Sequence, residues 1–143
     1  MAVESAPIWG PEGWAFHHVG YACRSLDRDR RTFEGLGYVQ AGAEFIDPRQ
    51  GVRGCFMELG AQRIELLENL EGSQTLTPWL QSGVSMYHLA YELADIEQGV
   101  AHLREMRAKL ISGPAPAVAF EGRRICFMML PNRLLVELIE FAV

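Results

Sequence analysis

The chain has 143 residues, of which 49% are hydrophobic and 22% charged, so it is long enough for one globular domain and unlike a disordered chain. Its formal net charge is −5 at pH 7 and no basic stripe runs along it, which argues against nucleic acid as a partner. No apolar stretch approaches the length that spans a membrane, so a membrane partner is not expected either.

The N-terminal segment predicts no regular structure. Residues 1–13 lack periodicity and are interpreted as an extension, which leaves residues 14–143 as a single domain. The segment has neither the basic start nor the apolar run of a secretory signal, which favours a cytoplasmic protein. Its breakers of regular structure are Pro7, Gly10 and Pro11.

The first half of the domain predicts a strand, a helix and three further strands. Ser25 is placed to cap a helix that presents Leu26 and Phe33 to the core and ends at Gly35 or Gly37. The segment DPRQG predicts a loop before the third strand. The strands are expected over residues 15–23, 38–45, 52–60 and 62–68, the last two joined at Gly60–Ala61.

The second half starts the same order again, after a connector over residues 69–83 that can hold a short helix around Trp79. Asp95 is placed to cap the second long helix, and a segment with glycine and proline, residues 111–120, follows it. The apolar stripe of this helix is expected to consist of Ile96, Val100, Leu103 and Leu110. Strands are expected over residues 85–93, 123–130 and 133–140.

The two halves resemble each other residue by residue, and this repeat is the strongest signal in the sequence. HHVGYA matches YHLAYE, which places His18 over His88, 70 residues later. CFMELGAQRIELLE matches CFMMLPNRLLVELIE, which places Glu65 over Glu137, 72 residues later. The repeat therefore predicts two similar modules. They span about residues 14–70 and about residues 84–143.

A twofold repeat brings equivalent residues together about the axis that relates the two modules. If His18 and Glu65 approach that axis, His88 and Glu137 must approach it as well. Two carboxylates that meet in a half-buried place are costly unless a cation compensates their charge. The sequence therefore predicts one divalent-metal site, with these four residues as its ligands.

A lone histidine or glutamate in a strand is more often an ordinary core or surface residue than a metal ligand. Other histidines and glutamates near the four predicted ligands are therefore compared with them. His17 has no counterpart, since Tyr87 holds its repeat position, and it is expected on the opposite strand face from His18. Glu68 and Glu140 are also paired by the repeat and are expected to be exposed strand ends.

The ligand set favours an open metal site. Two neutral imidazoles and two carboxylates suit Mn, Fe(II), Co, Ni or Zn, and Mg is compatible. A structural zinc site would close tetrahedrally and usually use thiolates. A catalytic or ligand-binding metal is therefore the better prediction.

The cysteines indicate no further metal or redox motif. They are widely spaced beside apolar residues and lack the close pairing of a zinc knuckle. Buried, reduced thiols in a reducing cytoplasm are expected. The three are Cys23, Cys55 and Cys126.

Over roughly residues 15–141, the sequence resembles the vicinal oxygen chelate superfamily. The resemblance rests on the pattern H-[VL]-[GA]-Y followed by a helix and IELLE, which is repeated as HLAYEL and VELIE. This superfamily includes glyoxalase I, bleomycin-resistance proteins, extradiol dioxygenases and methylmalonyl-CoA epimerase. The resemblance implies an α+β fold of two tandem βαβββ modules that form a curled eight-stranded mixed sheet around a metal cleft. It also implies a homodimer, which is common in the family. The ligands that it implies are His18, Glu65, His88 and Glu137.

Within the superfamily, the sequence looks most like methylmalonyl-CoA epimerase, although it departs from that pattern at one position. The likeness lies in the segment HHVGYACRSLDRDRRTFEGLGY, the Gln-Gly-Val of residues 50–52 and the closing VELIE. Epimerases of this family commonly carry a glutamate base just before the Gln-Gly-Val. This chain has Arg49 there, and an arginine cannot abstract a proton at neutral pH.

The base must therefore be another residue. Glu137 is the first candidate, because a ligand glutamate acts as the base in the glyoxalase branch. Asp47, two residues before Arg49, is the second candidate, and Glu44 lies five residues before Arg49. Asp47 and Pro48 are equally well explained as residues that form a turn, without a catalytic role. An anionic substrate group could contact one of several arginines, although surface solvation is the simpler account of each. These are Arg49, Arg53, Arg123 and Arg124.

The resemblance implies a metal-dependent epimerase, isomerase or lyase that acts through an enolate on a small carbonyl or acyl-thioester substrate, including an anionic acyl thioester. One alternative is a non-catalytic drug- or antibiotic-binding protein of the bleomycin-resistance type, whose members lack the metal ligands. Others are a glyoxalase I-like lyase and an Fe(II) dioxygenase. Metal-binding residue types at all four positions favour an enzyme over a binding protein.

Overall fold

The computed structural model describes residue 11 and residues 13–141. Pro7 and Gly10 of the expected N-terminal extension lie outside these residues, so the bounds of the extension stay a prediction. Over the described part of the chain, no helix is long and apolar enough to cross a membrane.

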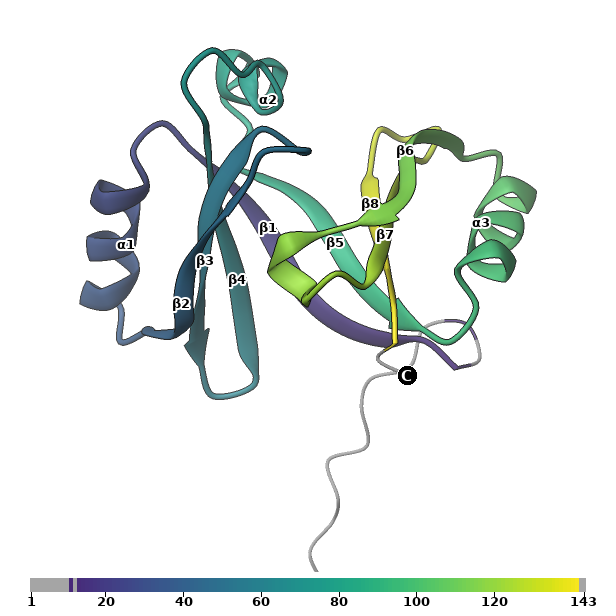
Figure 1. Cartoon of the computed structure of the whole chain (residues 1–143), viewed down its shortest axis with the longest axis horizontal. Coiled ribbons are helices and arrows are strands. Elements are labelled where there is room, and N and C mark those ends of the chain that lie inside the picture. The colour runs from purple at the N-terminus through teal and green to yellow at the C-terminus, as the bar shows by residue number, and fades with distance from the viewer. Residues whose placement is uncertain (1–10, 12, 142–143) are drawn as a thin grey trace, which may run out of the picture.

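The described residues form two βαβββ modules joined by a short helix (Figure 1). The first module contains β1 (Ala15–Cys23), α1 (Leu26–Gly35), β2 (Val39–Asp47), β3 (Val52–Leu59) and β4 (Gln62–Asn69). The connecting helix is α2 (Thr77–Ser82). The second module contains β5 (Met86–Leu93), α3 (Ile96–Glu105), β6 (Lys109–Pro116), the 3-10 turn η1 (Val118–Phe120), β7 (Arg124–Met129) and β8 (Leu135–Glu140).

All eight strands belong to one open mixed sheet with the order β2-β3-β4-β1-β5-β8-β7-β6. β1 pairs in parallel with β4, β5 pairs in parallel with β8, and the antiparallel pair β1–β5 joins the two modules. Figure 1 shows α1 and α3 on the outer sides of the two halves. The fold expected from the family resemblance is confirmed.

The repeat extends to the register of the strands. Glu65 on β4 lies opposite Gly20 on β1, and Glu137 on β8 lies opposite Ala90 on β5, the residue equivalent to Gly20. On the other side of each glutamate, β3 and β7 present Phe56 and Phe127. The two modules therefore place equivalent side chains at equivalent points of the sheet.

The capping predicted for α1 is present. The Ser25 hydroxyl accepts a hydrogen bond from the backbone N–H of Arg28 at 3.2 Å, and Leu26 and Phe33 are buried. The helix ends at Gly35, with Leu36 as the capping residue. A serine cap and two apolar residues on one helix face are thus sufficient to place this helix on the sheet.

Glu68 and Glu140 differ from the expectation of exposed strand ends. Glu68 accepts hydrogen bonds from the backbone N–H of Leu26 and from Arg53 Nε, both at 2.8 Å, so it satisfies a free donor at the start of α1. Glu140 binds Arg124 at 2.6 Å. The sequence does not reveal these roles, because the partners come from other elements.

The second module contains two further differences. α3 is capped by Asp95 as expected, but it ends at Glu105, so Leu110 belongs to β6 and is 37% exposed instead of completing the helical stripe. Much of residues 111–120 also belongs to β6, which stands at the end of the sheet. Proline is tolerated on such a strand, because one row of its backbone groups needs no partner.

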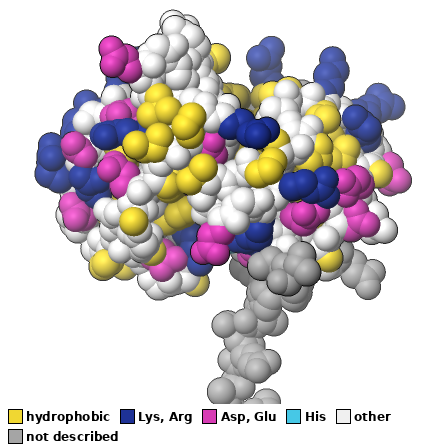
Figure 2. All heavy atoms as spheres, in the orientation of Figure 1, with side chains coloured by type: hydrophobic (Ala, Val, Ile, Leu, Met, Phe, Trp, Pro, Cys, Tyr) yellow, Lys and Arg dark blue, Asp and Glu magenta, His cyan; other side chains and the backbone are white. Residues whose placement is uncertain are grey.

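The cysteines lie in the core, and charged side chains of both signs lie on the surface. Cys23, Cys55 and Cys126 are buried and unpaired, as predicted. Figure 2 shows acidic and basic side chains interleaved over one face of the molecule. On α1, for example, Arg30 pairs with Asp27 at 2.7 Å.

Candidate metal centre

The four predicted ligands come from the four central strands of the sheet. β1 provides His18, β4 Glu65, β5 His88 and β8 Glu137. Because β1 and β5 pair across the junction of the modules, the repeat brings each histidine beside the glutamates of both halves. All four side chains are buried.

The structure brings these side chains together around one point. The two Nε2 atoms of His18 and His88 are 3.0 Å apart. Glu65 Oε1 lies 3.1 Å from His18 Nε2 and 3.7 Å from His88 Nε2. Glu137 Oε1 lies 3.2 Å and 3.1 Å from the same atoms. One donor atom from each residue lies within 4.8 Å of the other three.

This donor set fits a divalent cation. Among the described residues, Glu137 Oε1 is buried and accepts no hydrogen bond of acceptable geometry, although two imidazole nitrogens face it. Two imidazole lone pairs and two carboxylates that point at one buried position repel one another without a positive charge between them. Two nitrogen and two oxygen donors suit a borderline first-row ion, with room for further ligands.

The electrostatics of the cluster also favour positive charge at this point. Burial alone would lower the pKa of His18, but the carboxylates of Glu65 and Glu137 outweigh burial and raise this pKa. Burial alone would raise the pKa of Glu137, but the two imidazoles beside it lower that pKa. Both shifts have the same cause, because the buried carboxylates stabilise positive charge between them.

His17 does not point to the opposite face of β1, as strand alternation had predicted. The pairing of β1 with β5 is irregular between Phe16 and His18, which leaves His17 as an extra residue. Its Nδ1 atom lies 2.7 Å from His18 Nδ1. Burial, followed by the charge of His18, lowers the pKa of His17 to about 3, so its ring is neutral.

A second irregularity on β5 has the same effect on Tyr87. The register shifts between Gly20 and Tyr21 on β1, and Tyr87 opposes neither residue. The ring of Tyr87 lies 4.5 Å from that of His88, edge to face. Tyr87 and His17 hold equivalent repeat positions, so each module places an extra aromatic ring beside its own histidine.

Aromatic side chains cover the cluster. Phe120 on η1 stacks on His18 with ring centroids 5.9 Å apart and an angle of 18° between the planes. Phe56 lies 5.5 Å from the ring of His18, and Phe127 lies 5.2 Å from the ring of His88. Such a cover excludes water and strengthens electrostatic interactions beneath it.

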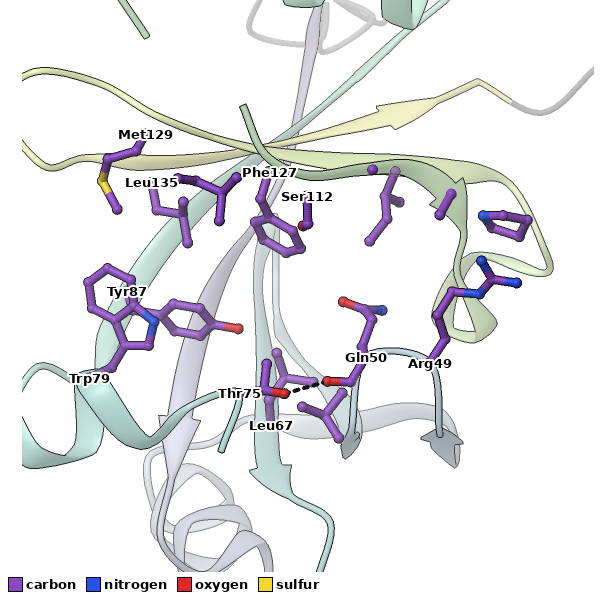
Figure 3. Close-up of a pocket in the computed structure, with 16 residues that line it drawn as sticks. Arg49, Gln50, Leu67, Thr75, Trp79, Tyr87, Ser112, Phe127, Met129 and Leu135 are labelled. Atoms are coloured by element: carbon purple, nitrogen blue, oxygen red, sulfur yellow. Dashed lines mark hydrogen bonds between the residues drawn. The ribbon is translucent and has the colours of Figure 1, made fainter. Parts of the chain in front are cut away.

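A cavity of about 440 Å³, whose lining residues are drawn in Figure 3, lies next to His88. Tyr87 and Phe127, which both contact His88, line it. The cavity has the size of an ordinary small-molecule site. The arrangement therefore places the cluster of His and Glu side chains next to space for a ligand.

The comparison with known families agrees with this geometry. The family model described as "Glyoxalase/Bleomycin resistance protein/Dioxygenase superfamily" matches residues 17–127. The chain belongs to this superfamily. The superfamily assignment that the sequence resemblance implied is thus confirmed.

Among its relatives in the superfamily are methylmalonyl-CoA epimerases. The mitochondrial enzyme of Mus musculus is 25% identical over 127 residues, which cover 87% of this chain and 70% of the mouse protein. The ethylmalonyl-CoA/methylmalonyl-CoA epimerase of Cereibacter sphaeroides is 26% identical over 114 residues, 78% of this chain and 85% of that protein.

Solved structures of the superfamily are also similar. Methylmalonyl-CoA epimerase from Mycobacterium tuberculosis has a TM-score of 0.71 and 27% identity, over 90% of this chain and 88% of that chain. A variant of the Streptomyces coelicolor epimerase, in complex with 2-nitronate-propionyl-CoA, has a TM-score of 0.72 and 25% identity, over 90% and 97% of the two chains. A hypothetical protein from Bacillus halodurans C-125 has a TM-score of 0.77 and 26% identity, over 92% and 97%.

Asp47, the second candidate for a superfamily base, lies outside the cluster and is fully engaged in hydrogen bonds. Its Oδ1 atom accepts from the backbone N–H groups of Arg49 and Gln50. Its Oδ2 atom accepts from Gln50 Nε2 at 2.9 Å and from the backbone N–H of Val118 at 3.0 Å. Asp47 thus ties the β2–β3 turn to η1 of the other module, and its catalytic role stays a prediction.

The arginines that were considered for substrate binding divide into two groups. Arg49 lines the cavity. The other three bind carboxylates: Arg53 pairs with Glu68, Arg123 with Glu92 at 2.7 Å and Arg124 with Glu140. Sequence reasoning could not separate these groups, because the acidic partners lie on other strands, 15 to 31 residues away in the sequence.

Proposed function

We propose that this protein is a divalent-metal-dependent epimerase or isomerase that acts through an enolate on a small carbonyl or acyl-thioester substrate. The observation that carries the proposal is the convergence of four buried donor atoms within 4.8 Å beside a cavity. Epimerase relatives at about 25% identity support the reaction class. A cytoplasmic homodimer stays a prediction.

The metal would be held by His18 and His88 through Nε2 and by Glu65 and Glu137 through Oε1. When bound, it would act as a Lewis acid that polarises the substrate carbonyl and makes the neighbouring C–H more acidic. Co, Mn, Ni, Zn, Fe and Mg are the candidate ions. The aromatic cover of Phe56 and Phe120 would keep water away from the reacting carbon.

Glu137 is the proposed base. In the register of the sheet, Glu137 on β8 lies opposite Phe127 on β7, and Phe127 lines the cavity. As in the glyoxalase branch, the carboxylate would leave the metal and accept the substrate proton. In an isomerase, the same carboxylate would return the proton to the other carbon of the enolate, whereas an epimerase would need a proton donor on the opposite face of the enolate. Arg49, at the position of the usual epimerase base, cannot take this role.

A purely drug-binding protein is the less favoured alternative. Members of the superfamily that only sequester ligands have no need for ionisable side chains at the ligand positions. Here all four are kept, buried and directed at one point. Burial of two carboxylates without function would only destabilise the fold. The same donor set would also serve a glyoxalase-type lyase, so the choice of substrate separates the enzyme classes.

Replacement of Glu137 tests the proposal. Metal-loaded protein in deuterium oxide should exchange the α-proton of a methylmalonyl thioester, as followed by NMR. Glu137→Gln should lower exchange by about 100-fold or more and leave a measurable metal affinity. Glu65→Gln is the matched control, because it changes the equivalent ligand on β4. It should keep more activity than the Glu137 variant, and full activity of Glu137→Gln would refute the assignment.

A further inference from the structure

The cavity and the metal cluster occupy the same face of the sheet. Leu67 lines the cavity two residues after Glu65 on β4, and Leu135 lines it two residues before Glu137 on β8. Residues two apart on a strand point to the same face. A ligand that reaches the cluster therefore has the cavity directly beside it.

One end of the cavity is apolar and aromatic. Figure 3 shows Trp79, Met129 and Leu135 gathered on one side, with Tyr87 and Phe127 next to them. The rings of Trp79 and Tyr87 are 5.5 Å apart, and all five residues belong to one hydrophobic cluster. This end offers a continuous apolar wall formed by α2, β5, β7 and β8.

Polar groups lie toward the other end. Arg49 and Gln50 lie away from Trp79 in Figure 3, and Arg49 is the one charged residue among those that line the cavity in the described part of the chain. Arg49 is itself exposed. A charged substrate group at the apolar end would therefore be buried without a partner, which is costly.

From this division we infer that the substrate carries an apolar or aromatic substituent larger than a methyl group. This substituent packs against Trp79, Met129 and Leu135, while the oxygen atoms of the substrate face the cluster. The inference rests on the proposed function, since it assumes a substrate that chelates at the cluster. A methyl substituent would leave most of this apolar wall in contact with water. A longer or aromatic substituent removes that surface from water and gains affinity.

Binding of substituted malonates tests this inference without turnover. Methyl-, butyl- and benzylmalonate carry the same two carboxylates and differ only in the substituent. Each is titrated calorimetrically into protein loaded with Co²⁺. Affinity should rise by about fourfold for each added methylene, and benzylmalonate should bind more tightly than methylmalonate.

Trp79→Ala should flatten this series by weakening the binding of butyl- and benzylmalonate while methylmalonate is unaffected. Tyr38→Ala is the matched control, because it removes a half-buried ring from the hydrophobic cluster of the first module, outside the cavity. It should leave the series unchanged. Equal affinity of the wild type for all three malonates, or a preference for methylmalonate, would overturn the inference.

The outcomes separate the inference from the proposed function. Preference for the larger malonates together with no α-proton exchange on any acyl thioester would support the inference and refute the proposed enzyme. Rapid exchange on a methylmalonyl thioester, with no preference among the malonates, would support the enzyme and refute the inference.

Discussion

Gly20 on β1 lies directly opposite His88 on β5, and the imidazole of His88 occupies the space that a side chain at position 20 would need. A Cβ atom at this position would overlap three atoms of the ring. The absence of a side chain at Gly20 is therefore a condition for the observed position of the His88 imidazole.

Gly20→Ala should consequently displace His88 and weaken metal binding by at least about 10-fold, since one of four donors leaves its place. The crowding should also lower the free energy of unfolding by about 1–3 kcal/mol. Calorimetric titration with Co²⁺ and urea unfolding measure the two effects. Gly35→Ala is the control, because nothing lies within 4 Å of a Cβ there, and it should preserve metal affinity. Unchanged affinity in Gly20→Ala would show that His88 is not a ligand in its observed position.

His17 should orient His18 through the contact between their Nδ1 atoms. If His18 binds the metal through Nε2, its Nδ1 carries the proton and donates to the neutral ring of His17. His17→Phe removes this acceptor and should weaken metal affinity by about 10- to 100-fold. His17→Asn, which can place an oxygen at the same point, should recover much of that loss. The Co²⁺ absorption spectrum should change in the Phe variant, and equal affinities of both variants and the wild type would exclude this role.

Asp47 should contribute to stability in a pH-dependent manner. Burial alone would raise its pKa, but hydrogen bonds from Gln50 and from the backbone N–H groups of Val118 and Arg49 outweigh burial and lower it. A pKa lowered by folding gives a stabilisation that is complete above the ordinary carboxyl pKa of about 4 and is lost as the pH falls through the folded value.

Asp47→Asn should therefore lower the free energy of unfolding by about 1–3 kcal/mol at pH 7, because an amide cannot accept hydrogen bonds at both positions. The difference from the wild type should shrink as the pH falls below about 4. Urea unfolding at several pH values measures it. Asp27→Asn, in which the replaced carboxylate is exposed on α1, should change stability by less than about 1 kcal/mol. A constant difference at all pH values would contradict the linkage.

Much of the fold and the cluster was predictable because the repeat carries information that single residues lack. The pairs His18–His88 and Glu65–Glu137 follow from aligning the two halves, and the structure places them in equivalent registers. The helix capped by Ser25 was predictable from local chemistry alone.

What the sequence did not reveal depends on irregular strands and on contacts between distant elements. Strand alternation assigns His17 to the wrong face, because nothing in the sequence marks the extra residue in β1. Phe120 was missed as a cover of His18, because η1 has no counterpart in the first module. The contact between Asp47 and Val118 joins residues 71 positions apart and leaves no local pattern.

The most direct test of the account is the stoichiometry of metal binding. Metal-free protein titrated with Co²⁺ should bind one ion per chain, and His88→Ala should weaken this binding by about 100-fold or more, because it removes a buried donor. His102→Ala, which replaces a histidine on α3 outside the cluster, should bind like the wild type. If the wild type and His88→Ala bind Co²⁺ equally, or if neither binds it, the four side chains do not form a metal centre.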